Sequence, residues 1–247
     1  MIFRQTMFWG VVFATIGLAG EVSHAGDIMR SRPVGVVELF TSQGCSSCPK
    51  ADAALEKLAE HPDLVAISYH VDYWNYLGWE DTLGEKENTE RQYAYAKSLG
   101  HTNVYTPQMV LNGIADIKER EPSRIVQSLK TLARNGKGPA VPVDATLTPE
   151  EMTIRIGAGE GKADVVVAYF RKMTRVEITR GENEGKMMSY RNAVTSLQTV
   201  GMWEGKEMEI KLPAAMVKKE GHDGCAILLQ SHDADGNPGR IYGASAL

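Results

Sequence analysis

Two apolar, β-branched runs joined by one amphipathic helix constrain the fold of this chain more than any other feature. Residues 34–40 and 64–70 are nearly continuous in apolar side chains, which is typical of strands buried on both faces. Between them apolar residues recur at helical spacing over 51–59, until His61-Pro62 ends the pattern. Because a single helix separates the two strands, the sequence predicts a parallel, right-handed βαβ unit.

The alternation of strand and helix patterns continues as far as residue 134. Asn112-Gly113 is the strongest short hairpin signal in the chain, because both residue types accept the positive φ angles of a type I′ turn. The expected order is β-α-β-α-β-β-α over residues 33–136, an α/β domain. Its later elements are expected as a helix at 85–99, strands at 108–111 and 114–117, and a helix at 122–134.

Beyond a Gly-rich linker at residues 135–139 the hydrophobic period changes to two. Alternating apolar and polar residues, broken by Gly-rich segments, predict short antiparallel strands. The sequence therefore predicts that a small antiparallel β-sandwich domain over residues 140–247 follows the α/β domain. Within it, the charged segment 180–186 is interpreted as a hairpin or a solvated loop.

The amino end has the pattern of a secretory signal peptide. Arg4 precedes an apolar stretch at residues 7–19, and Ser23 and Ala25 fit the small-x-small cleavage rule. We expect residues 1–25 to be removed, although an uncleaved anchor is the alternative. The mature chain then has no integral membrane segment, and we expect it in the periplasm or secreted, where disulfides persist.

Charge and composition limit the classes of partner. The formal net charge is −4, and the chain has no Lys/Arg run, so a nucleic-acid partner is not expected. We find no residue spacing typical of a P-loop, a hydrolase triad or a metal cage, and no cofactor is expected. With three cysteines in 247 residues, the chain is not a disulfide-stapled scaffold.

The chemistry is carried by Cys45-Ser46-Ser47-Cys48-Pro49, which lies between the first buried strand and the first turn of the following helix. A sulfur at a helix amino terminus faces unpaired N–H groups and the positive end of the helix dipole, which favour a thiolate. Cys45 is the expected nucleophile. Cys48, placed one turn into the helix, is expected to resolve a mixed disulfide by attacking Cys45.

Three other interpretations of the cysteine pair remain open. Tetrahedral zinc needs four ligands, and the chain has no second CxxC or closely spaced Cys/His pair. A structural disulfide suits a secreted chain. Copper as Cu(I) would suit both thiolates together with the imidazole of His70 or His101.

The topology and the position of the CxxC motif resemble the thioredoxin-like superfamily. The resemblance implies a thioredoxin-like fold, with Thr106 and Pro107 forming a cis-proline loop that packs beside the cysteines and binds an extended peptide. It also implies that an acid on the first strand moves a proton to the resolving cysteine, and Glu38 is the candidate. An ordinary strand-leading proline and a solvated or edge Glu38 are the alternatives.

Four longer strings are similar to those of a family of secreted bacterial proteins of unknown function. The strings are VELFTSQGCSSCPKAD, HVDYWNYLGWED, YTPQMVLNG and GENEGK. They extend over nearly the whole mature chain, including the predicted β-sandwich. The resemblance indicates membership but implies no substrate.

Aromatic residues follow the second predicted strand. Trp74 and Trp79 are interpreted as a lid or a peptide-binding wall beside the CxxC motif, with packing over the sheet edge as the alternative. His70, at the strand end, is a proton carrier or simply a hydrogen-bonded side chain. Cys225 is expected to be a buried, inert thiol, with a third redox partner as the alternative.

Together these patterns predict a secreted thiol–disulfide oxidoreductase that acts through Cys45 and Cys48 on protein or small thiols. A protein thiol or disulfide is the expected partner. A copper-binding or copper-delivery protein, and an interaction module with a structural disulfide, are the alternatives from other classes.

Overall fold

The structure is a computed structural model that describes residues 1–2, 32–218 and 221–247. Most of the predicted signal peptide, residues 3–25, lies outside the described residues, so that prediction stays a prediction. Among the helices in the described part, none has the length and apolar character needed to cross a membrane.

The described chain forms three α-helices, two short 3₁₀ turns and eleven strands. The helices are α1 (Pro49–Ala59), α2 (Lys86–Ser98) and α3 (Pro122–Arg134), and the 3₁₀ turns are η1 (Asn75–Leu77) and η2 (Ala214–Met216). The first strands are β1 (Gly35–Thr41), β2 (Leu64–His70), β3 (Gln108–Leu111) and β4 (Ala115–Ile117). The later strands are β5 (Val143–Leu147), β6 (Glu151–Ile156), β7 (Ala163–Glu177), β8 (Met187–Trp203), β9 (Met208–Pro213), β10 (Gly224–His232) and β11 (Pro238–Ala246).

The first seven main elements confirm the predicted order of strands and helices. β1 and β2 pair in parallel with Gly35 opposite Leu64, as expected for a βαβ unit around α1. β3 pairs antiparallel with β1 and continues through a turn at Asn112-Gly113 into β4. Both turn residues have positive φ, 50° and 71°, as the hairpin signal required.

The sheets of the second half differ from the short strands that the sequence pattern predicted. β7 and β8 are 15 and 17 residues long and form one extended hairpin. They join the first-half strands in a single eight-stranded sheet of order β11-β10-β7-β8-β2-β1-β3-β4, and β5-β6-β9 form a separate antiparallel sheet. The link between the halves is a parallel pairing of Ser68 with Ala193, a register that the periodicity of either strand alone does not specify.

The two faces of β1 pack against different helices. Val37 and Leu39 lie in an apolar cluster with residues of α1 and α3. Val36 and Phe40, on the opposite face, lie in a cluster that includes Tyr95 of α2 and residues of β10 and β11. The position of each residue along β1 therefore decides which helix its side chain meets.

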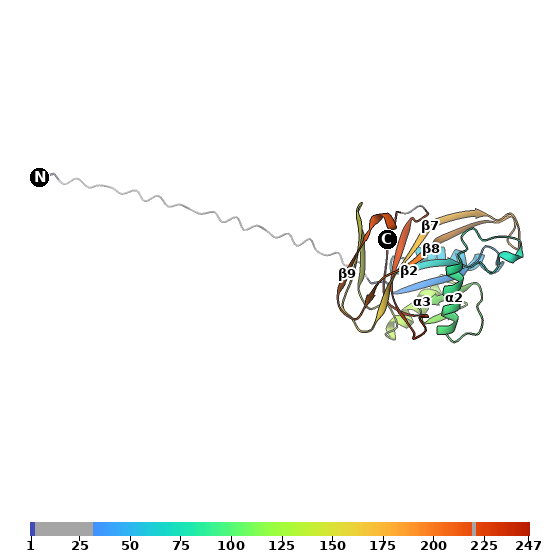
Figure 1. Ribbon diagram of the computed structural model, residues 1–247, viewed down its shortest axis with the longest axis horizontal. Coiled ribbons are helices and arrows are strands. Elements are labelled where there is room, and N and C mark those ends of the chain that lie inside the picture. Colours follow the sequence, from blue (N-terminus) through green and yellow to red (C-terminus); the bar gives the residue numbers. More distant parts are fainter. Residues whose placement is uncertain (3–31, 219–220) are drawn as a thin grey trace.

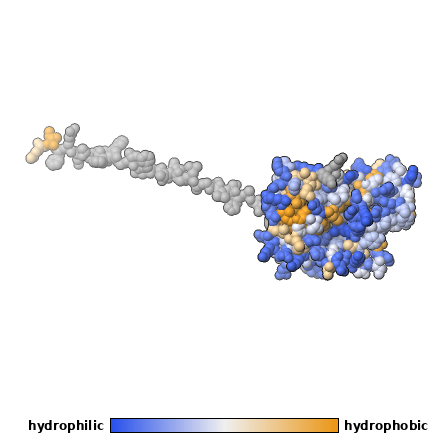
Figure 2. Space-filling model, viewed as in Figure 1, coloured by the Kyte–Doolittle hydropathy of each residue, from blue (hydrophilic) through white to orange (hydrophobic). Residues whose placement is uncertain are grey.

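A third cluster fills the space between the three-stranded sheet and the larger one. Its members include Met152 and Ile154 of β6 on one side and Val165 and Ile227 on the other. In Figure 1 this part of the molecule lies at the β9 end, whereas α3 lies near the middle and α2 further from β9. The view in Figure 2 is mostly hydrophilic, with apolar residues gathered on the side that carries β9 and the C-terminus.

The turn between β3 and β4 joins the two halves of the chain. Asn112 is buried; its Oδ1 accepts a hydrogen bond from the Val36 amide at 2.8 Å, and its carbonyl accepts one from the Ile241 amide at 2.9 Å. The neighbouring Gly113 faces the carbonyl of Gly239, which would lie only 2.0 Å from a Cβ atom at position 113. A left-handed backbone and a close approach both require glycine there.

We predict that Gly113→Ala destabilises the protein far more than Gly100→Ala. Both glycines have positive φ, 71° and 73°, but a Cβ at position 100 meets nothing within 4 Å. We expect Gly100→Ala to cost about 1 kcal/mol from the backbone alone, and Gly113→Ala about 2 kcal/mol more from the clash with β11. Urea unfolding of both variants measures the difference, and equal losses would contradict the predicted contact.

Candidate functional site

The cysteine pair lies where β1 ends and α1 begins, as predicted. Cys45 and Cys48 form a disulfide with their Cα atoms 5.4 Å apart. Cys48 is the N-cap of α1 and Pro49 follows at the first helical position, so Cys48 precedes the helix rather than lying one turn inside it. Proline suits that position because its missing N–H would have no partner within the helix. The disulfide therefore sits directly at the amino end of α1.

Both sulfurs are shielded from solvent. Cys45 is 2% exposed and Cys48 is fully buried, whereas Ser46 and Ser47 between them are exposed. The Sγ atom of Cys45 lies 3.4 Å from the Ser47 hydroxyl oxygen. Solvent thus reaches the intervening serines but hardly reaches the disulfide.

The loop connecting β7 to β8 covers the cysteine loop, and we name residues 178–186 the hairpin tip. The buried Asn183 side chain donates from its Nδ2 to the carbonyls of Gln43 and Cys45, each at 2.9 Å. A Glu182 carboxylate oxygen accepts from the Ser46 amide at 3.3 Å. The sequence indicated a charged hairpin or a solvated loop here, but nothing in it placed this segment against the cysteines 138 residues away.

A cluster of buried ionisable side chains lies at the same end of the sheet. His70, at the end of β2, binds the Asp81 carboxylate through Nδ1 at 2.9 Å, and both side chains are fully buried. Asp52, in the first turn of α1, accepts a hydrogen bond from the Thr41 hydroxyl at 2.7 Å. Asp52 follows Cys48 by four residues, a spacing that puts neighbouring side chains on one helix face.

The members of this cluster shift one another's pKa values. Burial raises the pKa of Asp52 to about 7, although the charge of His70 and the Thr41 hydrogen bond work in the opposite direction. Burial also lowers the pKa of His70, but the charge and hydrogen bond of Asp81 outweigh it and the pKa is raised. The pKa of Asp81 is lowered, because His70 and backbone N–H groups outweigh its burial.

Three polar atoms at this cluster have no hydrogen-bond partner among the described residues. They are Asp52 Oδ2, His70 Nε2 and the Tyr190 hydroxyl. The rings of His70 and Tyr190 meet edge to face with centroids 4.5 Å apart. A buried acid with a pKa near neutrality and a free oxygen is able to take or release a proton, which an ordinary surface carboxylate does not do near pH 7.

Glu38 is held on the other face of β1. Arg91 of α2 donates to its Oε1 at 2.6 and 3.0 Å, and the Tyr95 hydroxyl donates to Oε2. Because Glu38 alternates with Val37 and Leu39, it faces α2 and not α1. The structure therefore places Asp52 in the first turn of the helix that Cys48 begins, whereas Glu38 is engaged on the α2 face. Asp52 in the first helical turn looked like an ordinary acidic residue in the sequence.

Of the other predicted site residues, Trp74 and Trp79 contact the cysteine loop, and Thr106 is linked to it through Trp74. The Thr106-Pro107 bond is cis, as the resemblance implied, and the Thr106 hydroxyl accepts a hydrogen bond from Trp74 Nε1 at 2.7 Å. Trp74 also packs beside Gly44, where an added Cβ would lie 3.1 Å from the Trp74 Cβ. Trp79 donates from Nε1 to Gln43 Oε1 at 2.8 Å. Both tryptophans thus fix loops that flank the disulfide.

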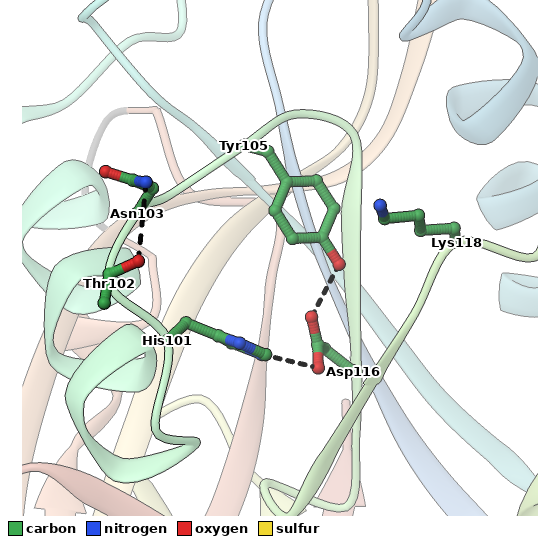
Figure 3. Close-up of a pocket in the computed structure, with 6 residues that line it drawn as sticks. All are labelled: His101, Thr102, Asn103, Tyr105, Asp116 and Lys118. Atoms are coloured by element: carbon green, nitrogen blue, oxygen red, sulfur yellow. Dashed lines mark hydrogen bonds and ion pairs between the residues drawn. The ribbon is translucent and has the colours of Figure 1, made fainter.

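An open pocket of about 360 Å³ adjoins the Thr106-Pro107 segment. It is lined by His101, Thr102, Asn103, Tyr105, Asp116 and Lys118. In Figure 3 the side chains of His101 and Tyr105 converge on Asp116, whose two carboxylate oxygens they bind at 2.9 and 2.5 Å. These side chains satisfy one another and leave a polar, solvent-open hollow.

The structure gives no support to the copper interpretation. Within residues 1–2, 32–218 and 221–247, no group of three or more His, Cys, Asp or Glu side chains is arranged to hold a metal ion. His70 binds Asp81 and His101 binds Asp116. The zinc interpretation likewise has no ligand group in this part of the chain.

Cys225 lies apart from the pair, in the core between the two sheets. It is fully buried, its Sγ lies 3.6 Å from Met152 Sδ, and burial raises its pKa to about 11. A thiol that holds its proton this firmly is unreactive near neutral pH, which agrees with the expected inert role.

Comparisons with known proteins give a family match and two related structures. Residues 36–230 match a family described as protein of unknown function, DUF1223. A crystal structure of an Agrobacterium tumefaciens protein, a structural genomics target, is 52% identical with a TM-score of 0.81, covering 87% of this chain and 94% of that one. HBP35 of Porphyromonas gingivalis is 15% identical with a TM-score of 0.53, covering 87% and 75%, a likeness of fold alone. No curated protein matches the chain.

We predict that Asp52→Asn changes how stability depends on pH. The folded protein raises the pKa of Asp52 from 3.8 to about 7, so it binds that proton more tightly than the unfolded chain does. The stability that protonated Asp52 contributes to the wild type should therefore be lost as pH rises from about 4 to about 7, and Asp52→Asn should lack this loss, which is on the order of 4 kcal/mol.

Denaturant unfolding of the oxidised protein at pH 4, 6 and 8 measures this effect. Glu56→Gln is the control, because it removes a carboxylate from a partly exposed position of the same helix. Stability curves for wild type and Asp52→Asn that stay parallel over this pH range would show that Asp52 is not the group concerned.

Proposed function

The chain belongs to the DUF1223 family of proteins of unknown function, and we propose that it is a thioredoxin-like thiol–disulfide oxidoreductase of the periplasm or the secreted fraction. The observation that carries the proposal is the Cys45–Cys48 disulfide at the amino end of α1, directly after the buried strand β1. The substrates are protein thiols and disulfides or small thiols.

In the proposed fold, residues 33–136 form the thioredoxin-like domain and residues 140–247 the β-sandwich domain. The order β1-α1-β2-α2-β3-β4-α3, with a central parallel pair and an antiparallel β3-β4 hairpin, supports the first assignment. The packing of β5-β6-β9 over β7 and β10 supports the second. Trp74, Trp79, Thr106 and Pro107 form the proposed docking surface for a partner, because they flank the cysteine loop.

The exchange reaction moves two electrons between the chain and a partner dithiol. A partner thiolate attacks Cys45 Sγ, the Cys45–Cys48 bond breaks, and Cys48 leaves as a thiolate that takes up a proton. The partner's second thiolate then attacks the mixed disulfide and releases Cys45 as a thiolate near the amino end of α1, where the helix dipole stabilises it. The partner becomes a disulfide and the chain a dithiol, and every step is reversible.

We propose that Asp52, rather than Glu38, gives a proton to the Cys48 thiolate and takes it back from the thiol. Asp52 stands four residues after Cys48 on α1, has a free buried oxygen, and has a pKa of about 7. At that pKa the carboxyl both gives and accepts a proton near neutral pH. Glu38 is paired with Arg91 on the opposite face of β1 and has no such freedom.

Burial of the pair favours a second candidate, an interaction module whose disulfide is structural. Exposures of 2% for Cys45 and 0% for Cys48 are low for a bond that partners must reach. The two functions differ in reduction potential, because a resistant structural disulfide lies below about −300 mV, whereas exchange proteins lie between about −270 and −120 mV. Equilibration of the mature protein with glutathione and dithiothreitol redox buffers measures this value.

We predict that Cys48→Ala traps partners as mixed disulfides on Cys45. Without the resolving thiol, the attack that would release the partner cannot occur. The trapped species are recovered from the periplasmic or secreted fraction and identified on non-reducing gels and by mass spectrometry.

A double variant, Cys45→Ala with Cys48→Ala, controls for background disulfides, and Cys225→Ala with Cys48→Ala excludes linkage through the third cysteine. Mixed disulfides that depend on Cys45 and contain the same partners in repeated preparations support exchange. Their absence under both oxidising and reducing conditions, together with a potential below about −300 mV, would establish the structural disulfide instead.

A further inference from the structure

The hairpin tip makes two kinds of contact with the cysteine loop, one neutral and one charged. Asn183 is 1% exposed and binds the backbone carbonyls of Gln43 and Cys45, on both sides of Gly44. Glu182 is exposed, and its carboxylate binds the amide of Ser46, the residue directly after Cys45. These contacts join residues 136 to 140 positions apart in the chain, so the folded arrangement of the sheet is what creates them.

The Asn183 contact holds the cysteine loop against the hairpin tip, an arrangement that we call the closed form. The side-chain amide is itself held in place, because Lys186 donates to its Oδ1 at 2.8 Å. The tip is anchored below by Ile178, which packs with Leu83 and Tyr190 in a small buried cluster. A buried amide that loses two carbonyl partners costs about 1–3 kcal/mol, so the closed loop is stable at rest but within reach of thermal opening or partner binding.

The Glu182 contact opposes a thiolate on Cys45. The Ser46 N–H belongs to the residue directly after Cys45, and in this structure a carboxylate oxygen of Glu182 binds it at 3.3 Å. A negative charge next to Cys45 raises the free energy of a second one there, and it offsets part of the positive potential at the amino end of α1. A thiolate on Cys45 would thus form next to a residue whose amide already binds a carboxylate.

From these contacts we propose that Asn183 and Glu182 are positioning residues that hold the cysteine pair closed and disfavour the Cys45 thiolate until the hairpin tip moves aside. The proposal deepens the proposed exchange function and rests on it for its biological meaning. In this arrangement the second half of the chain regulates the site of the first half, and a partner that displaces the tip both uncovers Cys45 and removes the opposing charge.

Two variants separate the steric and the electrostatic parts. Asn183→Ala removes the anchor without changing charge. We expect dithiothreitol to reduce the disulfide of this variant about tenfold faster than that of the wild type, because opening of the wild-type loop must break two hydrogen bonds that the variant lacks. Glu182→Gln keeps the shape and removes the charge. We expect the glutathione equilibrium to shift about threefold toward the reduced form, a modest change because Glu182 is exposed and screened.

The pH dependence of Cys45 alkylation distinguishes an electrostatic role of Glu182 from a merely structural one, because loss of a structural contact alone would not shift its midpoint. In reduced Glu182→Gln, the midpoint of iodoacetamide alkylation should fall by about half a pH unit, the same free energy as the threefold equilibrium shift. Lys186 on the tip, and Asp52, His70 and Asp81 on the buried side, are unchanged in this variant.

Glu184→Gln is the matched control. Glu184 belongs to the same tip, is exposed and carries the same charge, and its contact within the described residues is a backbone hydrogen bond to Gly181. Equal shifts in Glu182→Gln and Glu184→Gln, or no shift in either, would overturn the charge assignment. Reduction of Asn183→Ala at the wild-type rate would overturn the anchor assignment, provided that its far-UV circular dichroism matches the wild type.

These measurements use only dithiothreitol, glutathione and iodoacetamide, so they do not depend on finding a partner. If Cys48→Ala traps nothing while Glu182→Gln and Asn183→Ala behave as expected, the exchange function fails and the positioning roles stand. If partners are trapped while both variants behave like wild type, the positioning roles fail and the exchange function stands.

Discussion

The pairing of β8 with β2 is the interaction on which the site depends. It consists of a short parallel contact, Ser68 opposite Ala193, supported by hydrogen bonds from the Ser68 hydroxyl to the Arg191 carbonyl and from the Asn192 side chain to the Ala66 carbonyl. Without it β2 would end the first-half strands as an open edge, which folded proteins avoid. With it the β7-β8 hairpin is carried past the sheet to the amino end of α1. The same few bonds therefore close an edge and bring Asn183 to Cys45.

The strand β1 separates two buried charge systems that would otherwise disturb each other. On the α2 face, Glu38 and Arg91 form an ion pair that Tyr95 and Gln230 complete with hydrogen bonds. Both carboxylate oxygens of Glu38 accept hydrogen bonds there, which is the condition under which buried charge is tolerated. On the α1 face, the pair of His70 and Asp81 leaves Asp52 Oδ2 and His70 Nε2 without partners. A satisfied network gives rigidity, whereas an incompletely satisfied one beside a disulfide keeps a proton available.

Local patterns predicted the elements of the first half well, because each depends on neighbouring residues. The apolar runs of β1 and β2, the proline that begins α1 and the Asn112-Gly113 turn are all readable within a few positions. The cysteine pair at a strand–helix junction was predictable for the same reason.

The sequence could not reveal contacts between residues that lie far apart along the chain. Asp52 is a buried acid on which the charges of His70 and Asp81 act, although both residues lie far from it in the sequence. Glu38 faces α2 because it alternates with Val37 and Leu39 along β1. The segment GENEGK is interpretable from the sequence as a charged hairpin or a solvated loop. Its position over the cysteine loop depends on the length of β7 and β8, which the sequence pattern of short strands did not predict.

The burial of the disulfide and the placement of the charges around it both limit the reactivity of Cys45. A thiolate at the amino end of α1 is favoured by backbone dipoles, and it would be reactive toward any disulfide in an oxidising compartment. Covering Cys45 with the hairpin tip limits access, and placing Glu182 at the Ser46 amide weakens the thiolate while the cover is in place. Because cover and charge lie on one segment, a partner that moves this segment changes both at once. Selectivity would then reside in whatever binds the tip and the loops fixed by Trp74 and Trp79, and the CxxC motif itself would supply only the reactivity.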